Sequence, residues 1–128
     1  FNLLWKFTHN NTGHFPYAYD FNGDGKDEIF SCYNMISSDG KLQWELPNDT
    51  DHTDEIVIGK FDPDIDEELL AIVSGWEGFM IVDKHGHILA RDINGHGQRI
   101  SVANYCPNMR GLQIATTTYW ENQGIIYL

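Results

Sequence analysis

Short apolar runs separated by polar turns recur along the whole chain, and none has the three-to-four-residue spacing of an amphipathic helix. The runs are rich in β-branched and aromatic residues and are bounded by Gly, Asn, Asp or Ser. This pattern predicts an all-β protein. We expect strands at residues 2–7, 17–19, 29–33, 35–36, 41–46, 69–73, 80–82, 87–90, 112–115 and 125–128.

The predicted strands fall into a repeat. Phe21, Phe61 and Tyr105 occupy equivalent places, so the chain repeats at spacings of 40 and 44 residues. A period of about 40 to 45 residues, with about four short antiparallel strands in each unit, is typical of β-propeller blades. We therefore expect a slice of a larger propeller, with an outer strand at 1–13, blades at 14–50 and 51–94, and an incomplete blade at 95–128. A slice with open sheet edges is expected to be unstable alone.

The loop at residues 20–28 spaces oxygen atoms as a calcium loop does. Side-chain oxygens fall at positions 1, 3, 5 and 9 around a glycine turn, which suits a hard cation that prefers oxygen ligands. The expected ligands are Asp20, Asn22, Asp24, the backbone carbonyl of Lys26, and Glu28. An EF-hand is excluded, because its position 12 would be Ser31 and both flanks have strand patterns. The alternative is an Asn-Gly-Asp-Gly hairpin turn without metal.

Two further loops stand at equivalent positions. The second has Lys60 at position 1, and its candidate calcium ligands at positions 3, 5 and 9 are Asp62, Asp64 and Glu68. The ammonium of Lys60 either replaces the metal as the local cation or turns out to solvent, so calcium at this loop is left open. The third loop has lost its carboxylates, and we expect no calcium at Asn104, Cys106 and Asn108.

Each repeat also has a histidine before the strand that leads into its loop. His14, His52 and His96 are therefore expected at one end of the propeller, as ligands for calcium or sugar or as links between adjacent blades. Recurrence in every unit favours the structural role, because catalysis needs asymmetry. Imidazole is a poorer calcium ligand than carboxylate, so Asp54 is the better calcium candidate in His52-x-Asp54.

Aromatic and arginine side chains are the other candidates for sugar contacts. Trp76, Tyr119 and Trp120 follow strands in matching turns, where they could stack on sugar rings or belong to the repeat. Arg99 and Arg110 could clamp a uronate carboxylate, or lie at the surface or between blades. By contrast, Trp5 and Trp44 recur in equivalent positions on the outer strand, which indicates a role in blade packing.

The composition limits the partners. The formal net charge is −11, which argues against nucleic acid and anionic membrane, and no apolar run reaches a transmembrane length. Cys32 and Cys106 are too few for a disulfide framework, and we expect two free thiols.

The motifs carry a family resemblance. Asp-x-Asn-x-Asp-Gly-x-x-Glu at 20–28 resembles FG-GAP and VCBS-type repeats, including those of integrin-type propellers. The segment from His52 through Asp54 to Asp64 resembles the His-Gly-Asp…Asp-Phe-Asp-Pro-Asp segment of polysaccharide lyase family 11, the rhamnogalacturonan lyases. Residues 95–99 and 119–126 are similar to further segments of these lyases. The resemblance covers nearly the whole chain but only a minority of an expected eight-bladed enzyme.

This resemblance implies calcium-dependent β-elimination on pectic polysaccharide, in an extracellular or cell-surface setting. A cation bound to the uronate carboxylate would stabilise the enolate that forms when a base takes the C5 proton. The implied partners are an acidic plant cell-wall polysaccharide and the rest of the propeller. The sequence identifies no catalytic base or acid, and we expect this chain alone to be inactive. Two alternatives stay open: a non-catalytic FG-GAP or VCBS-type propeller for glycan binding or adhesion, and a purely structural calcium-stabilised repeat.

Overall fold

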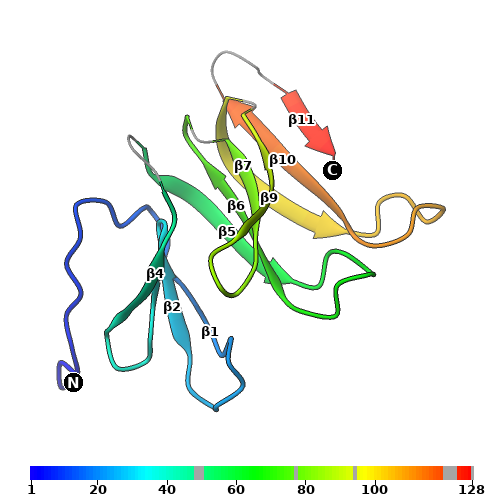
Figure 1. The fold of residues 1–128 in the computed structure, drawn as a ribbon. Coiled ribbons are helices and arrows are strands. Elements are labelled where there is room, and N and C mark those ends of the chain that lie inside the picture. The colour runs from blue at the N-terminus through cyan, green and yellow to red at the C-terminus, as the bar shows by residue number, and fades with distance from the viewer. Residues whose placement is uncertain (48–50, 77, 94, 120–123, 128) are drawn as a thin grey trace.

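The computed structural model describes residues 1–128 except 48–50, 77, 94, 120–123 and 128 (Figure 1). The described residues form eleven strands and no helix. Within them, therefore, no helix has the length and hydropathy of a membrane span. The expectation of an all-β protein is confirmed.

The strands form three antiparallel sheets that follow one another in chain order (Figure 1). The first sheet has the order β1-β2-β3-β4 and consists of β1 (Tyr17–Tyr19), β2 (Glu28–Ser31), β3 (Asn34–Ile36) and β4 (Leu42–Glu45). The second, β5-β6-β7-β8, consists of β5 (Thr53–Gly59), β6 (Leu69–Ser74), β7 (Phe79–Val82) and β8 (Ile88–Asp92). The third, β11-β10-β9, consists of β9 (His96–Ala103), β10 (Gln113–Tyr119) and β11 (Gly124–Tyr127).

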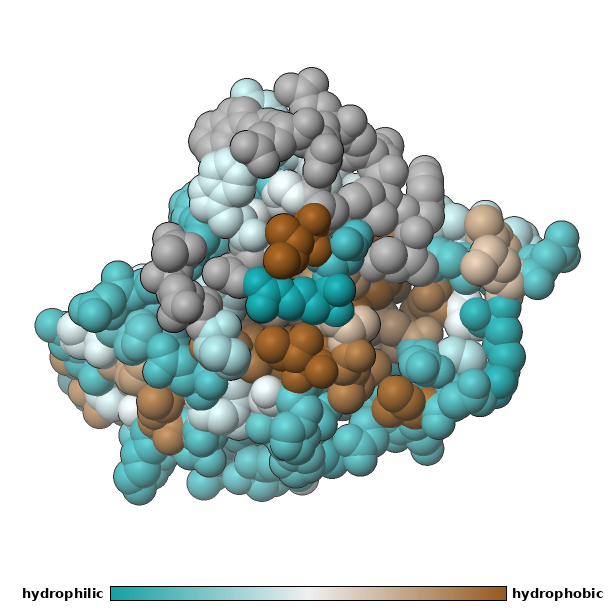
Figure 2. All heavy atoms as spheres, turned by 45° about the horizontal axis from the view of Figure 1, so that its top comes forward, coloured by the Kyte–Doolittle hydropathy of each residue, from teal (hydrophilic) through white to brown (hydrophobic). Residues whose placement is uncertain are grey.

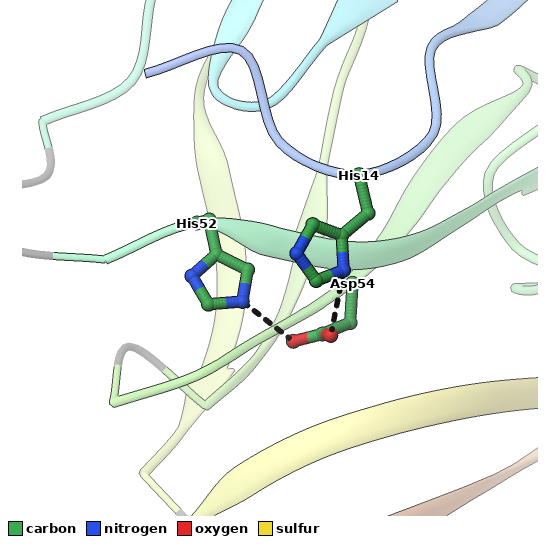
Figure 3. Close-up of side chains that lie close together, drawn as sticks. All are labelled: His14, His52 and Asp54. Atoms are coloured by element: carbon green, nitrogen blue, oxygen red, sulfur yellow. Dashed lines mark ion pairs between the residues drawn. The ribbon is translucent and has the colours of Figure 1, made fainter. Parts of the chain in front are cut away.

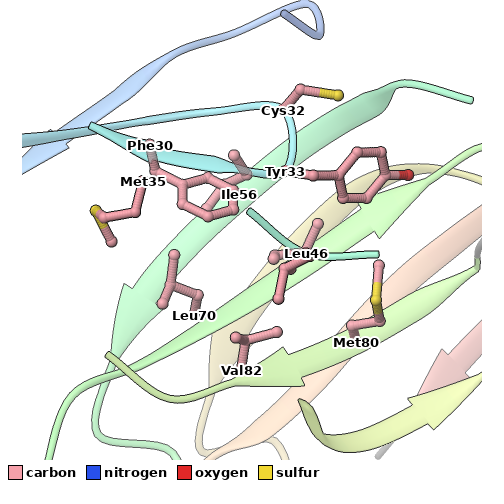
Figure 4. Close-up of a cluster of buried hydrophobic side chains, with 10 residues drawn as sticks. Phe30, Cys32, Tyr33, Met35, Leu46, Ile56, Leu70, Met80 and Val82 are labelled. Carbon is pink, nitrogen blue, oxygen red and sulfur yellow. The ribbon is translucent and has the colours of Figure 1, made fainter. Parts of the chain in front are cut away.

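The second sheet is covered on both faces, which explains the uninterrupted apolar run in β6. All six residues of β6 are buried, and successive side chains point to opposite faces. Leu70 and Ile72 join a core shared with the first sheet, part of which is shown in Figure 4. Leu69, Ala71 and Val73 join a second core shared with the third sheet. Each pair of neighbouring sheets is thus held face to face by its own apolar cluster.

Two tryptophans make equivalent contacts with turns of the next sheet along the chain. The indole nitrogen of Trp5 donates to the carbonyl of Ser38, and that of Trp44 donates to the carbonyl of Lys84, both at 2.9 Å. Each indole lies against a turn glycine, Gly40 or Gly86, whose φ is 84°. A Cβ at either glycine would stand within 2.9 Å of the indole. The packing role expected for Trp5 and Trp44 is confirmed.

The strand expected at 2–7 does not form, since residues 1–16 contain no strand. A β-strand requires a hydrogen-bonded neighbour. Among the described residues, segment 2–7 reaches the first sheet through a side-chain hydrogen bond, from Trp5 to the Ser38 carbonyl, and not through a backbone ladder. Both cysteines are free thiols as expected, Cys32 buried and Cys106 exposed.

Candidate histidine–aspartate site

Residues from all three repeats meet at one end of the sheets. His14 precedes β1, His52 directly precedes β5, Asp54 lies on β5, and His96 begins β9. The rings of His14 and His52 are 4.5 Å apart between centroids, and those of His52 and His96 are 5.7 Å apart. The expectation that the three histidines face one end is therefore confirmed.

The three imidazoles surround one carboxylate. Asp54 Oδ1 lies 3.5 Å from His14 Nδ1, and Asp54 Oδ2 lies 3.7 Å from His52 Nε2 (Figure 3). His96 Nε2 lies 3.3 Å from the same Oδ2. The side chain of Asp54 is only 6% exposed, whereas that of His14 is 57% exposed, so the cluster runs from the interior to the surface.

A glycine lets the chain before β1 approach β5. Gly13 has a φ of 67°, and a Cβ there would stand 2.6 Å from the hydroxyl of Thr53. This close approach allows the backbone N–H of His14 to donate to the carbonyl of Thr53 at 3.1 Å. The backbone contact places the His14 side chain over Asp54.

Burial dominates the electrostatics of Asp54. Desolvation raises the pKa of this carboxyl, and the neighbouring His96, His52 and His14 oppose the rise. Asp54 Oδ2 is also buried without a hydrogen bond from any residue that the structure describes. A buried and incompletely hydrogen-bonded carboxylate is stabilised by a nearby cation, which can be an imidazolium or a metal ion.

Asp51 holds His52 in place. Its Oδ1 lies 2.7 Å from His52 Nδ1, and its Oδ2 accepts the backbone N–H of Trp76 at 2.5 Å. The carboxylate occupies the space that a side chain at position 75 would fill, so Gly75 is required there. With Nδ1 engaged, His52 directs Nε2 toward Asp54. Sequence analysis missed this role of Asp51; its only local signal is its place next to His52.

The cluster could hold a metal ion. One ligand atom each from His14, His52 and Asp54 lies within 4.8 Å of the other two. Among the described residues, the carboxylates of the first loop do not form such a close group.

The first loop is instead organised around its own backbone. Asp20 accepts the N–H groups of Asp24 and Gly25 at 3.0 and 2.9 Å, and Asp24 accepts that of Lys26 at 2.9 Å. Glu28 is buried and accepts the N–H of Phe21 at 2.9 Å and the side-chain amide of Asn22 at 2.9 Å. The loop thus turns its carboxylates inward, and calcium binding there stays a prediction.

In the second loop, neighbouring cations pair with the carboxylates. Lys60 Nζ lies 2.6 Å from Asp66 Oδ1, and Arg110 of the third repeat lies 2.6 Å from Asp64 Oδ1. Glu68 accepts the hydroxyl of Tyr19 from the first repeat. Arg110 therefore links the second and third repeats. Lys60 is a local cation, but it pairs with Asp66, which is not one of the candidate calcium ligands.

The remaining sugar-contact candidates are exposed around the sheets. Trp76 is 47% exposed and Tyr119 is 51% exposed. Arg99 lies 3.6 Å from Glu55 and sits over the ring of Phe15 at 5.9 Å. Trp76 contacts the histidine–aspartate cluster through its backbone N–H, which donates to Asp51, and Tyr119 stands opposite His96 in the β9–β10 ladder. Trp120 lies outside the described residues.

The fold is similar to two solved structures. The exotype rhamnogalacturonan lyase YesX superposes with a TM-score of 0.72 and 24% identity, over 89% of this chain and 20% of that lyase. The rhamnogalacturonan lyase YesW superposes with a TM-score of 0.69 and 22% identity, over 88% of this chain and 21% of that lyase. The chain thus spans about a fifth of each lyase. No protein-family model and no curated protein matches it.

Proposed function

We propose that this chain is part of a calcium-binding β-propeller whose full-length form cleaves rhamnogalacturonan by β-elimination. The observation that carries the proposal is the fold likeness to two rhamnogalacturonan lyases over nearly the whole chain. In this proposal the three sheets are successive blades at 14–50, 51–94 and 95–128, and residues 1–13 supply the outer strand of a preceding blade. The substrate would place the protein outside the cell or at its surface.

Calcium fits the first loop on the chemistry of its donors. The loop offers carboxylate, amide and carbonyl oxygens and already bends its side chains inward. The proposed ligands are Asp20, Asn22, Asp24, the carbonyl of Lys26, and Glu28. When bound near substrate, calcium neutralises a uronate carboxylate and so makes the adjacent C5 proton more acidic. At this loop its proposed role is structural, because Glu28 joins the loop to β2.

The chain's own residues would contribute to binding at the end where the histidines meet. His14 and His52 present polar ring edges at this end. Asp51, which pairs with His52, also accepts the backbone N–H of Trp76, whose side chain is 47% exposed. Aromatic faces suit the apolar faces of sugar rings. Arg99 and Tyr119 are exposed and are further proposed sugar contacts. His96 is buried and would act indirectly, by positioning Asp54.

The test uses the full-length protein that carries this chain. It is incubated with rhamnogalacturonan I and, separately, with polygalacturonan, first in calcium and then in chelator. The readout is the absorbance of the unsaturated uronate that β-elimination leaves. We expect a calcium-dependent signal on rhamnogalacturonan alone. If the folded, calcium-loaded protein gives no signal, the lyase proposal is wrong, and glycan retention without cleavage would identify a binding propeller.

A further inference from the structure

The histidine–aspartate cluster differs in chemistry from the calcium loop. We propose that His14, His52 and Asp54 bind a divalent first-row transition-metal ion of the zinc class. This site is separate from residues 20–28, and the inference does not depend on lyase activity.

The donor set favours a borderline metal over calcium. Calcium takes about six to eight oxygen ligands, whereas imidazole suits zinc, copper, nickel and iron. The cluster offers two imidazole nitrogens and the carboxylate of Asp54. Asp51 adds little for calcium, because its oxygens already face His52 and the N–H of Trp76. Two nitrogens and one carboxylate, with solvent completing the shell, is a common zinc arrangement.

The spacing of the donors agrees with one shared ion. Two ligands at about 2.1 Å from a tetrahedral zinc ion stand about 3.4 Å apart. His14 Nδ1 lies 3.5 Å from Asp54 Oδ1, and His52 Nε2 lies 3.7 Å from Asp54 Oδ2. One ligand atom from each of the three residues lies within 4.8 Å of the other two. Binding would therefore need only small side-chain movements. Because His14 is largely exposed, the ion can enter from solvent on that side.

Two further features independently point to a cation. Asp54 is buried, and its Oδ2 accepts no hydrogen bond from the described residues, although His96 Nε2 and His52 Nε2 lie 3.3 and 3.7 Å from it, so that oxygen has capacity for a ligand. Asp51 engages His52 Nδ1 and leaves Nε2 directed toward Asp54. In metal-binding histidines the other ring nitrogen usually donates to a carboxylate, a backbone carbonyl or a water, which orients the ring in this way.

The test titrates the full chain with cobalt(II), whose visible absorption reports coordination, and then adds zinc or calcium as competitors. We expect one cobalt ion to bind, zinc to displace it, and excess calcium to leave it bound. His14→Ala, at an exposed position, should weaken cobalt binding at least tenfold while near-ultraviolet circular dichroism stays unchanged. Asp51→Asn should weaken binding by about 10 to 100-fold through loss of orientation.

His87→Ala is the matched control. His87 Nδ1 lies 2.8 Å from Asp83, so it forms a similar histidine–aspartate pair, but its side chain is 75% exposed and it lies on a turn. We expect cobalt affinity to stay unchanged in this variant. The proposal is overturned if the wild-type chain binds no cobalt, if His14→Ala binds as tightly as wild type, or if His87→Ala loses binding. Displacement of cobalt by excess calcium would also overturn it.

Discussion

The first and second loops occupy the same place in the repeat, yet their carboxylates are neutralised differently. In the second loop, Lys60 and Arg110 pair with Asp66 and Asp64. In the part of the chain that the structure describes, no Lys, Arg or His forms an ion pair with Asp20, Asp24 or Glu28. Among the described residues, the chain supplies its own cations to the second loop and none to the first.

Asp54 extends this contrast into the interior. Its neighbours are imidazoles, whose charge depends on protonation. A protein cation of fixed charge makes a metal unnecessary, whereas neutral nitrogen ligands beside a buried carboxylate suit one. The first loop, the second loop and Asp54 all offer carboxylates, but they differ in the cation beside them. The second loop has Lys and Arg, Asp54 has imidazoles, and the first loop has no ion-paired base among the described residues.

The largest expected effect comes from removing calcium. Chelation should destabilise the wild-type chain by about 2.7 kcal/mol if calcium was present at 100 times its Kd. Asp24→Ala should show that loss in calcium and change little in chelator. Asp27→Ala, an exposed residue of the same loop, serves as control. Thermal melts in both buffers measure this, and a chelator-insensitive wild-type melt would contradict calcium binding.

The difference between the two loops can be tested by giving the second loop the carboxylate pattern of the first. Lys60→Asp with Arg110→Ala should add a carboxylate at position 1 and free Asp64 from its ion pair. We expect one additional bound calcium, counted by calorimetric titration. Arg110→Ala alone keeps Lys60 and should add none. An unchanged calcium count in the double variant would show that backbone shape, not the local cation, separates the two loops.

The pH dependence of Asp54 is a smaller test, made without metal. Because the folded-state pKa is raised, mainly by desolvation, folding favours the protonated form. The stability due to this group is present below the unfolded pKa and is lost as pH rises through the folded pKa. Asp54→Asn should therefore gain stability relative to wild type across that window, as measured by urea denaturation. A constant difference at all pH values would contradict the burial argument.

The smallest effect is expected from Lys60→Ala. Lys60 and Asp66 form an exposed ion pair, and such pairs contribute little in solvent. Hydrogen bonding to the other partner raises the pKa of Lys60 and lowers that of Asp66. We expect the melting temperature to change only slightly and any change to disappear in high salt. A large change that salt does not screen would indicate a role beyond this pair.

Features set by local patterns could be predicted from the sequence. The apolar run at Leu69–Val73 lies in the central strand β6, and the equivalent tryptophans make equivalent contacts. The Asp and Asn spacing at 20–24 also anticipated a loop with inward-turned side chains. These features depend on strand alternation and turn chemistry, which act over a few residues.

Features that depend on distant segments could not be predicted in this way. Asp51 orients His52 only because Gly75 leaves space for its carboxylate. Arg110 of the third repeat pairs with Asp64 of the second, whereas the sequence pattern alone left Arg110 between a surface and an inter-blade role. The segment at 2–7 had a strand pattern, but strand formation depends on a partner that local sequence does not specify.

The tryptophan and turn-glycine contact also bears on how cooperatively the sheets unfold. Ala90 holds the place in the second sheet that Trp44 holds in the first. Trp44 pairs with Met35 on the neighbouring strand, and Ala90 pairs with Ile81. Ala90 instead lines an apolar groove of about 680 Å³. On the face of the molecule shown in Figure 2, apolar side chains reach the surface between hydrophilic ones. In a chain of stacked units, the free energy of each interface sets how strongly one unit's unfolding is transmitted to the next. The first two sheets should therefore unfold together. Amide hydrogens near the Ala90 groove should exchange with solvent earlier than those at the junction of the first two sheets.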